Sequence, residues 1–193
     1  MGLTIHYGLS LPGRPSAATV KAKVTALRQR CLDLPFQAVG ESRHLPGPAC
    51  DPEIQSDPSL RWFLIQAGAY VYFEYDSRGV PHMTEKFGED GQAMKVNAAR
   101  IIGFTVTPGP GCEPANVGLR LLPRTTKVPL KDGVRHVELK LSPATEGWQW
   151  SSFCKTQFAA SDSGGGSVEN FSAVISASWP CLITRGNLVL TWR

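Results

Sequence analysis

Apolar and polar residues alternate along several stretches of the chain, and this period of two predicts half-buried strands. In residues 3–11, apolar side chains occupy every second position from Leu3 to Leu9. The same alternation recurs at 134–142, in the sequence VRHVELKLS. Runs rich in branched and aromatic residues predict further strands at 99–108, 116–123 and 148–159. The chain is therefore expected to be rich in strands.

One helix is predicted after the first strand, because apolar residues recur there at steps of three and four. Ser16 precedes the repeat as an N-cap, and Pro35 ends it. Residues 36–46 predict a second strand, so the chain is expected to open with a β-α-β unit. The repeat itself consists of Val20, Val24, Leu27, Cys31 and Leu34.

The middle of the chain divides into three stretches of different character. Residues 46–59 contain four prolines and predict no regular structure. Aromatic and branched residues at 60–76 predict another strand, with Gly68 as a bulge or turn. The polar residues 76–98 predict a long loop. These stretches therefore add one strand and no helix to the expected fold.

Many strands and one clear helix predict an α+β fold, with a mostly antiparallel sheet, a β-α-β opening and the helix packed on one face. The other face of the sheet is then left for solvent, a partner or a ligand. A length of 193 residues with 42% hydrophobic residues fits one globular domain. We assign residues 1–171 to that domain and residues 172–193 to an atypical tail.

Composition and charge limit the cellular locations and the classes of partner that we expect. No stretch approaches the roughly 20 apolar residues of a membrane span, and the beginning of the chain lacks the pattern of a signal peptide. We therefore expect a cytoplasmic protein whose five widely spaced cysteines are reduced. The net charge of +4 is small, and the cations of the predicted helix are interpreted as a solvated face. Nucleic acid is accordingly not an expected partner.

Two polar segments at strand ends are candidates for a ligand pocket. Glycines and prolines stiffen the loop 108–116, which lowers the entropy cost of presenting Cys112, Glu113 and Asn116. The alternative is a rigid connection whose polar side chains satisfy only local amides. The second segment, 153–157, contributes Cys154, Lys155 and Gln157.

Cys154 and Lys155 are the candidates for catalysis, since a lysine beside a thiol lowers the pKa of the thiol and raises its reactivity. The candidates for ligand binding are Cys112, Glu113, Asn116 and Gln157. The chain lacks the P-loop, dinucleotide-binding and zinc-protease motifs, so no cofactor is identified and no residue is assigned to a metal. The sequence does not identify a reaction or a ligand.

Three functions stay open at this point. The first is a small-molecule-binding or enzymatic domain with a cysteine-containing pocket formed by residues 108–116 and 153–157. The second is a non-catalytic module that binds a protein partner. The third is a structural metal site in which Cys50, Cys112 and Cys154 converge.

Four segments carry a resemblance: LTIHYGLSL, LRQRCLDLPFQAVGE, GPGCEPANVGL and FCKTQFA. They resemble an uncharacterised family of bacterial conserved hypothetical proteins, over the chain up to about Phe171. The resemblance implies relatives but no established activity, cofactor or partner.

The end of the chain departs from the pattern of that family. The resemblance implies a Gly-Gly-x-x-Asn-Phe segment, echoed here by Gly165, Gly166, Asn170 and Phe171, and then an amphipathic helix that begins near Arg-Cys-His. Residues 172–193 do not match this helix, but one cytosine inserted after the Phe171 codon restores it with compatible codons. We interpret the tail as the product of a single-base frameshift, and we expect its apolar residues to favour self-association.

Overall fold

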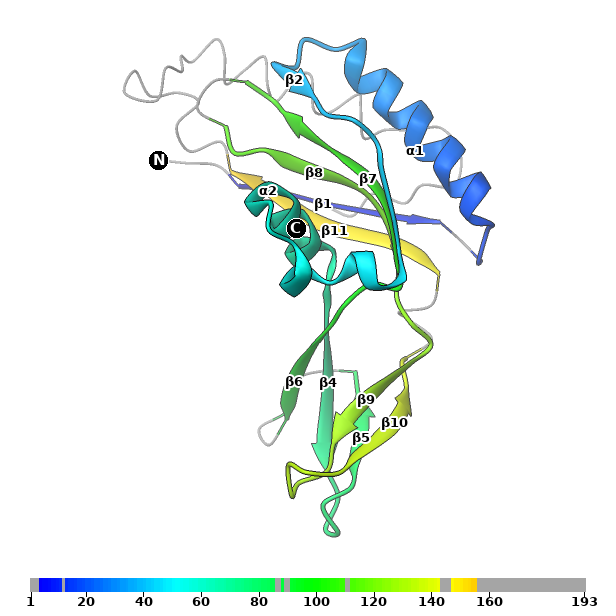
Figure 1. The fold of residues 1–193 in the computed structure, drawn as a ribbon, viewed down its shortest axis with the longest axis vertical. Helices are drawn as coiled ribbons and strands as arrows, with labels where there is room; N and C mark the ends of the chain where they lie inside the picture. Colours follow the sequence, from blue (N-terminus) through cyan, green and yellow to red (C-terminus); the bar gives the residue numbers. More distant parts are fainter. Residues whose placement is uncertain are drawn as a thin grey trace.

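The computed structural model describes residues 4–11, 13–85, 88, 91–109, 112–142 and 147–155. This part of the chain forms two α-helices, two short 3-10 helices and eleven strands. Figure 1 shows an upper part, the body, with a six-stranded sheet and both α-helices, and a lower part, the arm, with a three-stranded and a two-stranded sheet. All strand pairs are antiparallel, which confirms the predicted α+β fold with a mostly antiparallel sheet.

The body sheet places the first and the last described strands side by side. Its members are β1 (Thr4–Leu11), β2 (Ala38–Val39), β3 (Arg43–Pro46), β7 (Arg100–Thr107), β8 (Ala115–Leu121) and β11 (Trp148–Lys155). The order is β1-β11-β8-β7-β2, and β3 also pairs with β7. Because every step is antiparallel, β1 and β2 run parallel to each other at opposite ends of this order. The helix between them completes the predicted β-α-β unit.

The first helix, α1 (Ala17–Leu32), begins where the sequence predicts. The Ser16 side chain accepts a hydrogen bond from the Thr19 amide at 3.2 Å, which satisfies one of the free amides of the first turn. Four residues of the apolar repeat, from Val20 to Cys31, are buried on one side of the helix. Cys31 is also disulfide-bonded, which departs from the expectation that all cysteines are reduced.

The second helix, α2 (Pro58–Ala67), lies in a stretch that we predicted to be a strand. The Asp57 side chain accepts a hydrogen bond from the Ser59 amide at 2.9 Å, and Pro58 occupies the first turn, where its missing N–H costs nothing. Phe63, Leu64 and Ala67 are buried at helical spacing. The start signal and this spacing outweigh the strand preference of the aromatic residues, and the strand β4 (Ala69–Tyr75) begins only after Gly68.

Helices cover both faces of the body sheet at its centre. Phe63 of α2 lies so close to Gly103 of β7 that a Cβ atom at this glycine would be 2.9 Å from the Phe63 ring. Odd-numbered residues of β7 therefore face α2. Even-numbered residues such as Phe104 are also buried, and they face α1, which packs against the same strand. The predicted helix on one face is α1, and α2 is a second helix on the other face.

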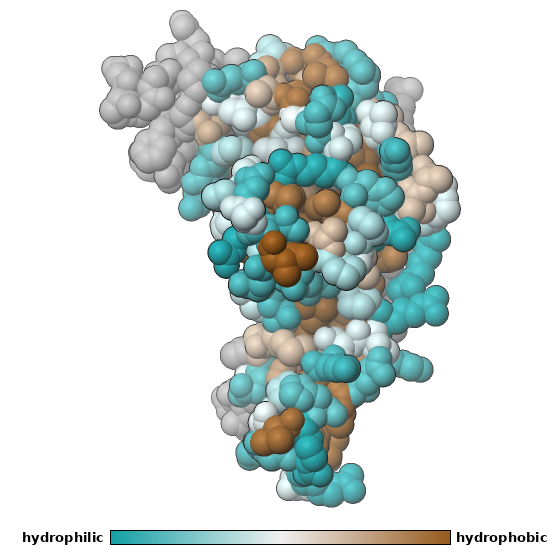
Figure 2. All heavy atoms as spheres, viewed as in Figure 1, coloured by the Kyte–Doolittle hydropathy of each residue, from teal (hydrophilic) through white to brown (hydrophobic). Residues whose placement is uncertain are grey.

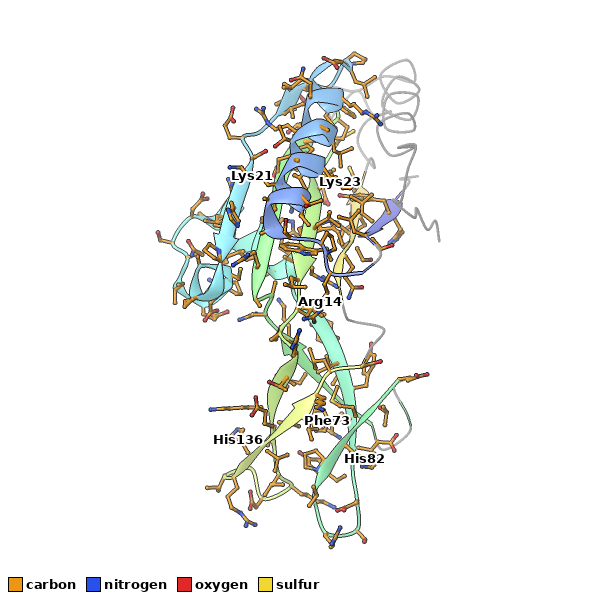
Figure 3. All side chains as sticks on the ribbon, turned by 90° about the vertical axis from the view of Figure 1, so that its right-hand side faces the viewer. Arg14, Lys21, Lys23, Phe73, His82 and His136 are labelled. Carbon is orange, nitrogen blue, oxygen red and sulfur yellow. The ribbon has the colours of Figure 1, made fainter. Side chains whose placement is uncertain are left out.

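The arm is formed by two separate insertions into the body. The first insertion contains β4, β5 (Pro81–Thr84) and β6 (Gln92–Val96) in the order β5-β4-β6, and the second is the hairpin of β9 (Thr125–Pro129) and β10 (His136–Lys140). Phe73 and Val128 are buried in the arm, whereas His82 and His136 are exposed (Figure 3). The prediction of a loop over 76–98 is therefore wrong, since this stretch contains two strands whose alternation is short and interrupted by turns.

The proline-rich stretch before α2 forms two single turns, η1 (Gly47–Cys50) and η2 (Pro52–Ile54). Neither of the described α-helices is long and apolar enough to cross a membrane. On the face shown in Figure 2, hydrophilic side chains predominate and hydrophobic ones form small separate groups. The molecule narrows between body and arm, and three connections of the described chain cross this neck: Gly68, 97–99 and 122–124.

Candidate functional site

The two segments that the sequence analysis singled out meet at one end of the body sheet. The Glu113 amide, in the loop before β8, donates a hydrogen bond to the Lys155 carbonyl of β11 at 2.9 Å. The Cys154 thiol donates to the Glu113 carbonyl at 3.1 Å, and the Lys155 ammonium lies 4.0 Å from the Glu113 carboxylate. Cys112, next to Glu113, therefore belongs to the same group, whereas Gln157 lies outside the described residues.

Burial sets the chemistry of the two thiols in this group. Cys154 is 3% exposed, and burial, followed by the proximity of Cys112 and Glu113, raises its pKa to about 12. Burial also raises the pKa of Cys112, with only a partial offset from a backbone hydrogen bond of Gly109. Lys155 pairs with Glu113 rather than activating Cys154. Because thiol nucleophiles and metal ligands act as thiolates, these shifts weigh against both roles for Cys154.

Asn116 lies apart from this group, in the interior beneath α2. Its side-chain oxygen accepts a hydrogen bond from Thr105 at 2.8 Å, and its side-chain nitrogen donates to Gln66 at 2.6 Å. Ser152 of β11 donates to the same Gln66 oxygen at 3.1 Å. The Asn116 side chain thus links β7, β8 and α2 from within, and its hydrogen bonds are those of a structural residue.

Cys50 does not join the other two cysteines. It is buried in η1, where its thiol donates to the Leu45 carbonyl at 3.0 Å and burial raises its pKa to about 11. Within the described ranges, no three His, Cys, Asp or Glu side chains are placed to hold a metal ion together. The structural metal site therefore gains no support from this part of the chain.

A cavity in the arm was not anticipated from the sequence. It has a volume of about 660 Å³ and is lined by three strand ends: residues 83–85 at the end of β5, Arg124 and Thr125 at the start of β9, and residues 140–142 at the end of β10. The start of β9 adjoins the connection 122–124, which crosses the neck. We call this space the neck cavity.

The pairing of β9 with β10 brings two of these strand ends together. Lys140 pairs directly with Thr125, and the ladder continues as the Leu141 amide donates to the Arg124 carbonyl at 3.0 Å. The lining combines the cations Arg124 and Lys140 with one carboxylate, three hydroxyl groups and two apolar side chains. The turn sequence DSRG at 76–79, one residue before PHMT at 81–84, is the one signal that could have identified β5, and with it one wall of the cavity.

Comparison with known proteins identified no relative of this chain. No protein-family model, no curated protein and no solved structure matches the chain. The functional argument therefore depends on the two groups of residues described above.

Proposed function

We propose that the protein is a small-molecule-binding domain whose ligand occupies the neck cavity. The observation that carries the proposal is the cavity volume of about 660 Å³, which suits a ligand of metabolite size. Its place at the junction of two parts of the molecule is also common for ligand sites.

The walls of the cavity support binding because paired strands hold them. Thr125 and Lys140 are partners in the β9–β10 ladder, and Met83 and Thr84 are paired with β4. Side chains on paired strands need little further ordering when a ligand arrives, which lowers the entropy cost of binding. The group around Cys154 has no such cavity among its described features, and its thiols are protonated at neutral pH. We therefore place the ligand in the neck cavity and propose no reaction.

A cavity-filling variant tests this proposal. A panel of common metabolites is screened for compounds that raise the melting temperature, since a ligand present at 100 times its Kd stabilises the folded state by about 2.7 kcal/mol. Met83→Trp, which fills the cavity, should abolish the stabilisation. Met94→Trp is the matched control, because Met94 is also partly buried, on the other edge strand of the same sheet, and does not line the cavity. A panel without any stabilising compound, or equal stabilisation of both variants, contradicts the proposal.

The alternative of a protein-interaction module is supported by the tip of the arm. Two turns meet there, as the Lys131 amide donates to the Gly79 carbonyl at 3.1 Å. Val134 is 80% exposed and Val80 is 40% exposed on these turns. Sedimentation analysis of the wild type and of Val134→Asp tests whether this tip supports self-association, which the charged variant should then abolish. The apolar tail at 172–193, the other candidate for self-association, lies outside the described residues.

We also propose a cytoplasmic location and membership of the bacterial family that the sequence resembles. Cys50, Cys112 and Cys154 are free thiols, which fits a reducing compartment, although the disulfide of Cys31 does not. Alkylation of thiols in freshly lysed cells, followed by mass spectrometry, tests the location. Free Cys50, Cys112 and Cys154 with a protected Cys31 would match the structure, and alkylation of all five cysteines would match a fully reducing compartment.

A further inference from the structure

We infer that the ligand of the neck cavity is a small organic anion, with a carboxylate or phosphate group held by Arg124 and Lys140. This inference depends on the proposed function, because it names the chemical class of the ligand for the same cavity. The two cations contribute more charge to the lining than the single carboxylate of Glu85 does, so the lining carries a net positive charge.

Neither cation of the cavity is neutralised by a described neighbour. The five ion pairs among the described residues leave out Arg124, Lys140 and Glu85. Two other arginines of the arm differ, since Arg78 and Arg135 each lie near an aspartate of their own turn, at 3.6 and 2.8 Å. The cations of the cavity are therefore available to a ligand, whereas these turn arginines already have a partner.

Both cations line the same cavity, Arg124 just before β9 and Lys140 at the end of β10. A guanidinium group offers parallel N–H donors that match the two oxygens of a carboxylate or phosphate, and an ammonium adds a compact charge beside it. The cavity lining thus offers two different kinds of donor to an anion.

The remaining lining residues indicate which chemical groups the rest of the ligand should carry. Met83 and Leu141 offer apolar surface for a carbon skeleton. The Thr125 hydroxyl donates a hydrogen bond to Glu138 of β10, so its oxygen faces the ligand as an acceptor at most. Glu85 places a negative charge on the lining. It should weaken the binding of every anion, and more so of molecules that carry acidic groups at both ends.

The test uses three probes of similar size: benzoate, phenyl phosphate and the neutral benzamide. Each probe is titrated into the full-length, isotope-labelled protein, and amide shifts in residues 83–85, 124–125 and 140–142 report binding in the cavity. Benzoate or phenyl phosphate should bind at least about tenfold more tightly than benzamide, as expected for one charge-assisted hydrogen bond. The stronger of the two anions then distinguishes a carboxylate ligand from a phosphate ligand.

Charge variants distinguish specific binding of an anion in the cavity from unspecific attraction of anions to the positively charged surface. Arg124→Gln and Lys140→Gln should each weaken anion binding about tenfold, and Glu85→Gln should strengthen it. Lys127→Gln is the matched control, because Lys127 is an exposed cation on β9 that does not line the cavity, and it should leave the Kd unchanged.

Three outcomes overturn the inference. Equal binding of benzamide and the anions shows that charge is not recognised, while the proposed binding function stands. Equal weakening by Lys127→Gln shows adventitious attraction to the arm surface. An absence of amide shifts with both anions contradicts the anion site. The proposed binding function fails only if, in addition, no compound of the metabolite panel gives a stabilisation that Met83→Trp abolishes.

Discussion

The Cys154 thiol donates a hydrogen bond to a backbone carbonyl and is almost fully buried. The lysine beside it in sequence points to the other side of the strand, as alternation requires, and pairs with Glu113. Desolvation, a nearby carboxylate and a second thiol all disfavour the thiolate. At the scale of single residues, burial therefore decides the chemistry of Cys154, although the sequence places a cation next to it.

Thiol labelling should follow exposure. In the native protein, iodoacetamide should modify the half-buried Cys112 faster than Cys154, by about tenfold or more, because only the thiolate reacts and Cys154 has a strongly raised pKa. Peptide mass spectrometry at successive times measures both rates. Labelling in urea is the control, since the two residues should then react alike. Faster native labelling of Cys154 would restore its role as a candidate nucleophile.

Stability should fall in alkaline solution in a way that depends on Cys154. The pKa of this thiol rises from 9.0 to about 12 on folding, so the unfolded chain ionises first as the pH increases. The contribution of Cys154 to stability is complete below pH 9 and is lost above it, at about 1.4 kcal/mol per pH unit. Urea unfolding at pH 8 and 10 should show a loss about 1 kcal/mol larger for the wild type than for Cys154→Ala. Equal losses would contradict the raised pKa.

At the scale of elements, local signals decided which parts of the fold were predictable. Helix α1 was predicted because a cap at Ser16 and an apolar repeat agree. Helix α2 was not, because the aromatic residues at 60–76 favour a strand and its cap at Asp57 lies in a proline-rich stretch. The strands β5 and β6 are short, and their pairing with β4 depends on tertiary structure rather than on a local pattern.

The candidate sites also differ in how far the sequence could predict them. The sequence analysis grouped the segments of Glu113 and Cys154 because each gathers polar residues at the end of a predicted strand, and the structure brings the two residues together. The inward position of Asn116 was not predictable, because its partners Thr105 and Gln66 come from other elements. The neck cavity combines three strand ends that are far apart in sequence, and no single segment carries its pattern.

The end of α2 is held by one buried arginine of the body sheet. The Arg120 guanidinium donates through Nη1 to the carbonyl groups of Ala67 and Gly68, at 3.1 and 2.6 Å. Burial lowers the pKa of Arg120 to about 10, and its Nε atom is buried without a hydrogen-bond partner among the described atoms. The favourable approach of a cation to the carbonyl end of a helix offsets this cost.

Removal of the Arg120 guanidinium group should destabilise the protein. Arg120→Met keeps much of the side-chain volume but leaves the last carbonyl groups of α2 unsatisfied, at a cost of about 2–4 kcal/mol. Urea unfolding at neutral pH measures the change. Arg124→Met, at an exposed arginine four residues further on, is the control and should change stability by less than about 0.5 kcal/mol. An unchanged or increased stability of Arg120→Met would mean that desolvation outweighs the hydrogen bonds.

At the scale of the whole molecule, the pairing of β1 with β11 joins the two ends of the described chain. Such distant pairing requires the closure of a long loop, which slows folding. Amides of β7 and β8, which are neighbours in sequence and in the sheet, should gain protection first, and amides of β1 last. Pulsed hydrogen exchange with mass spectrometry during refolding measures this order. Early protection of β1 would contradict it.

The three described connections across the neck also have a mechanical consequence. A part joined by one linker can rotate freely, whereas several connections side by side restrict its rotation. The arm should therefore behave as a stiff lever, and a force applied to its tip should be transmitted along β4 into the last turn of α2. A ligand would then enter the neck cavity through an opening that already exists, rather than by the closure of one part upon the other.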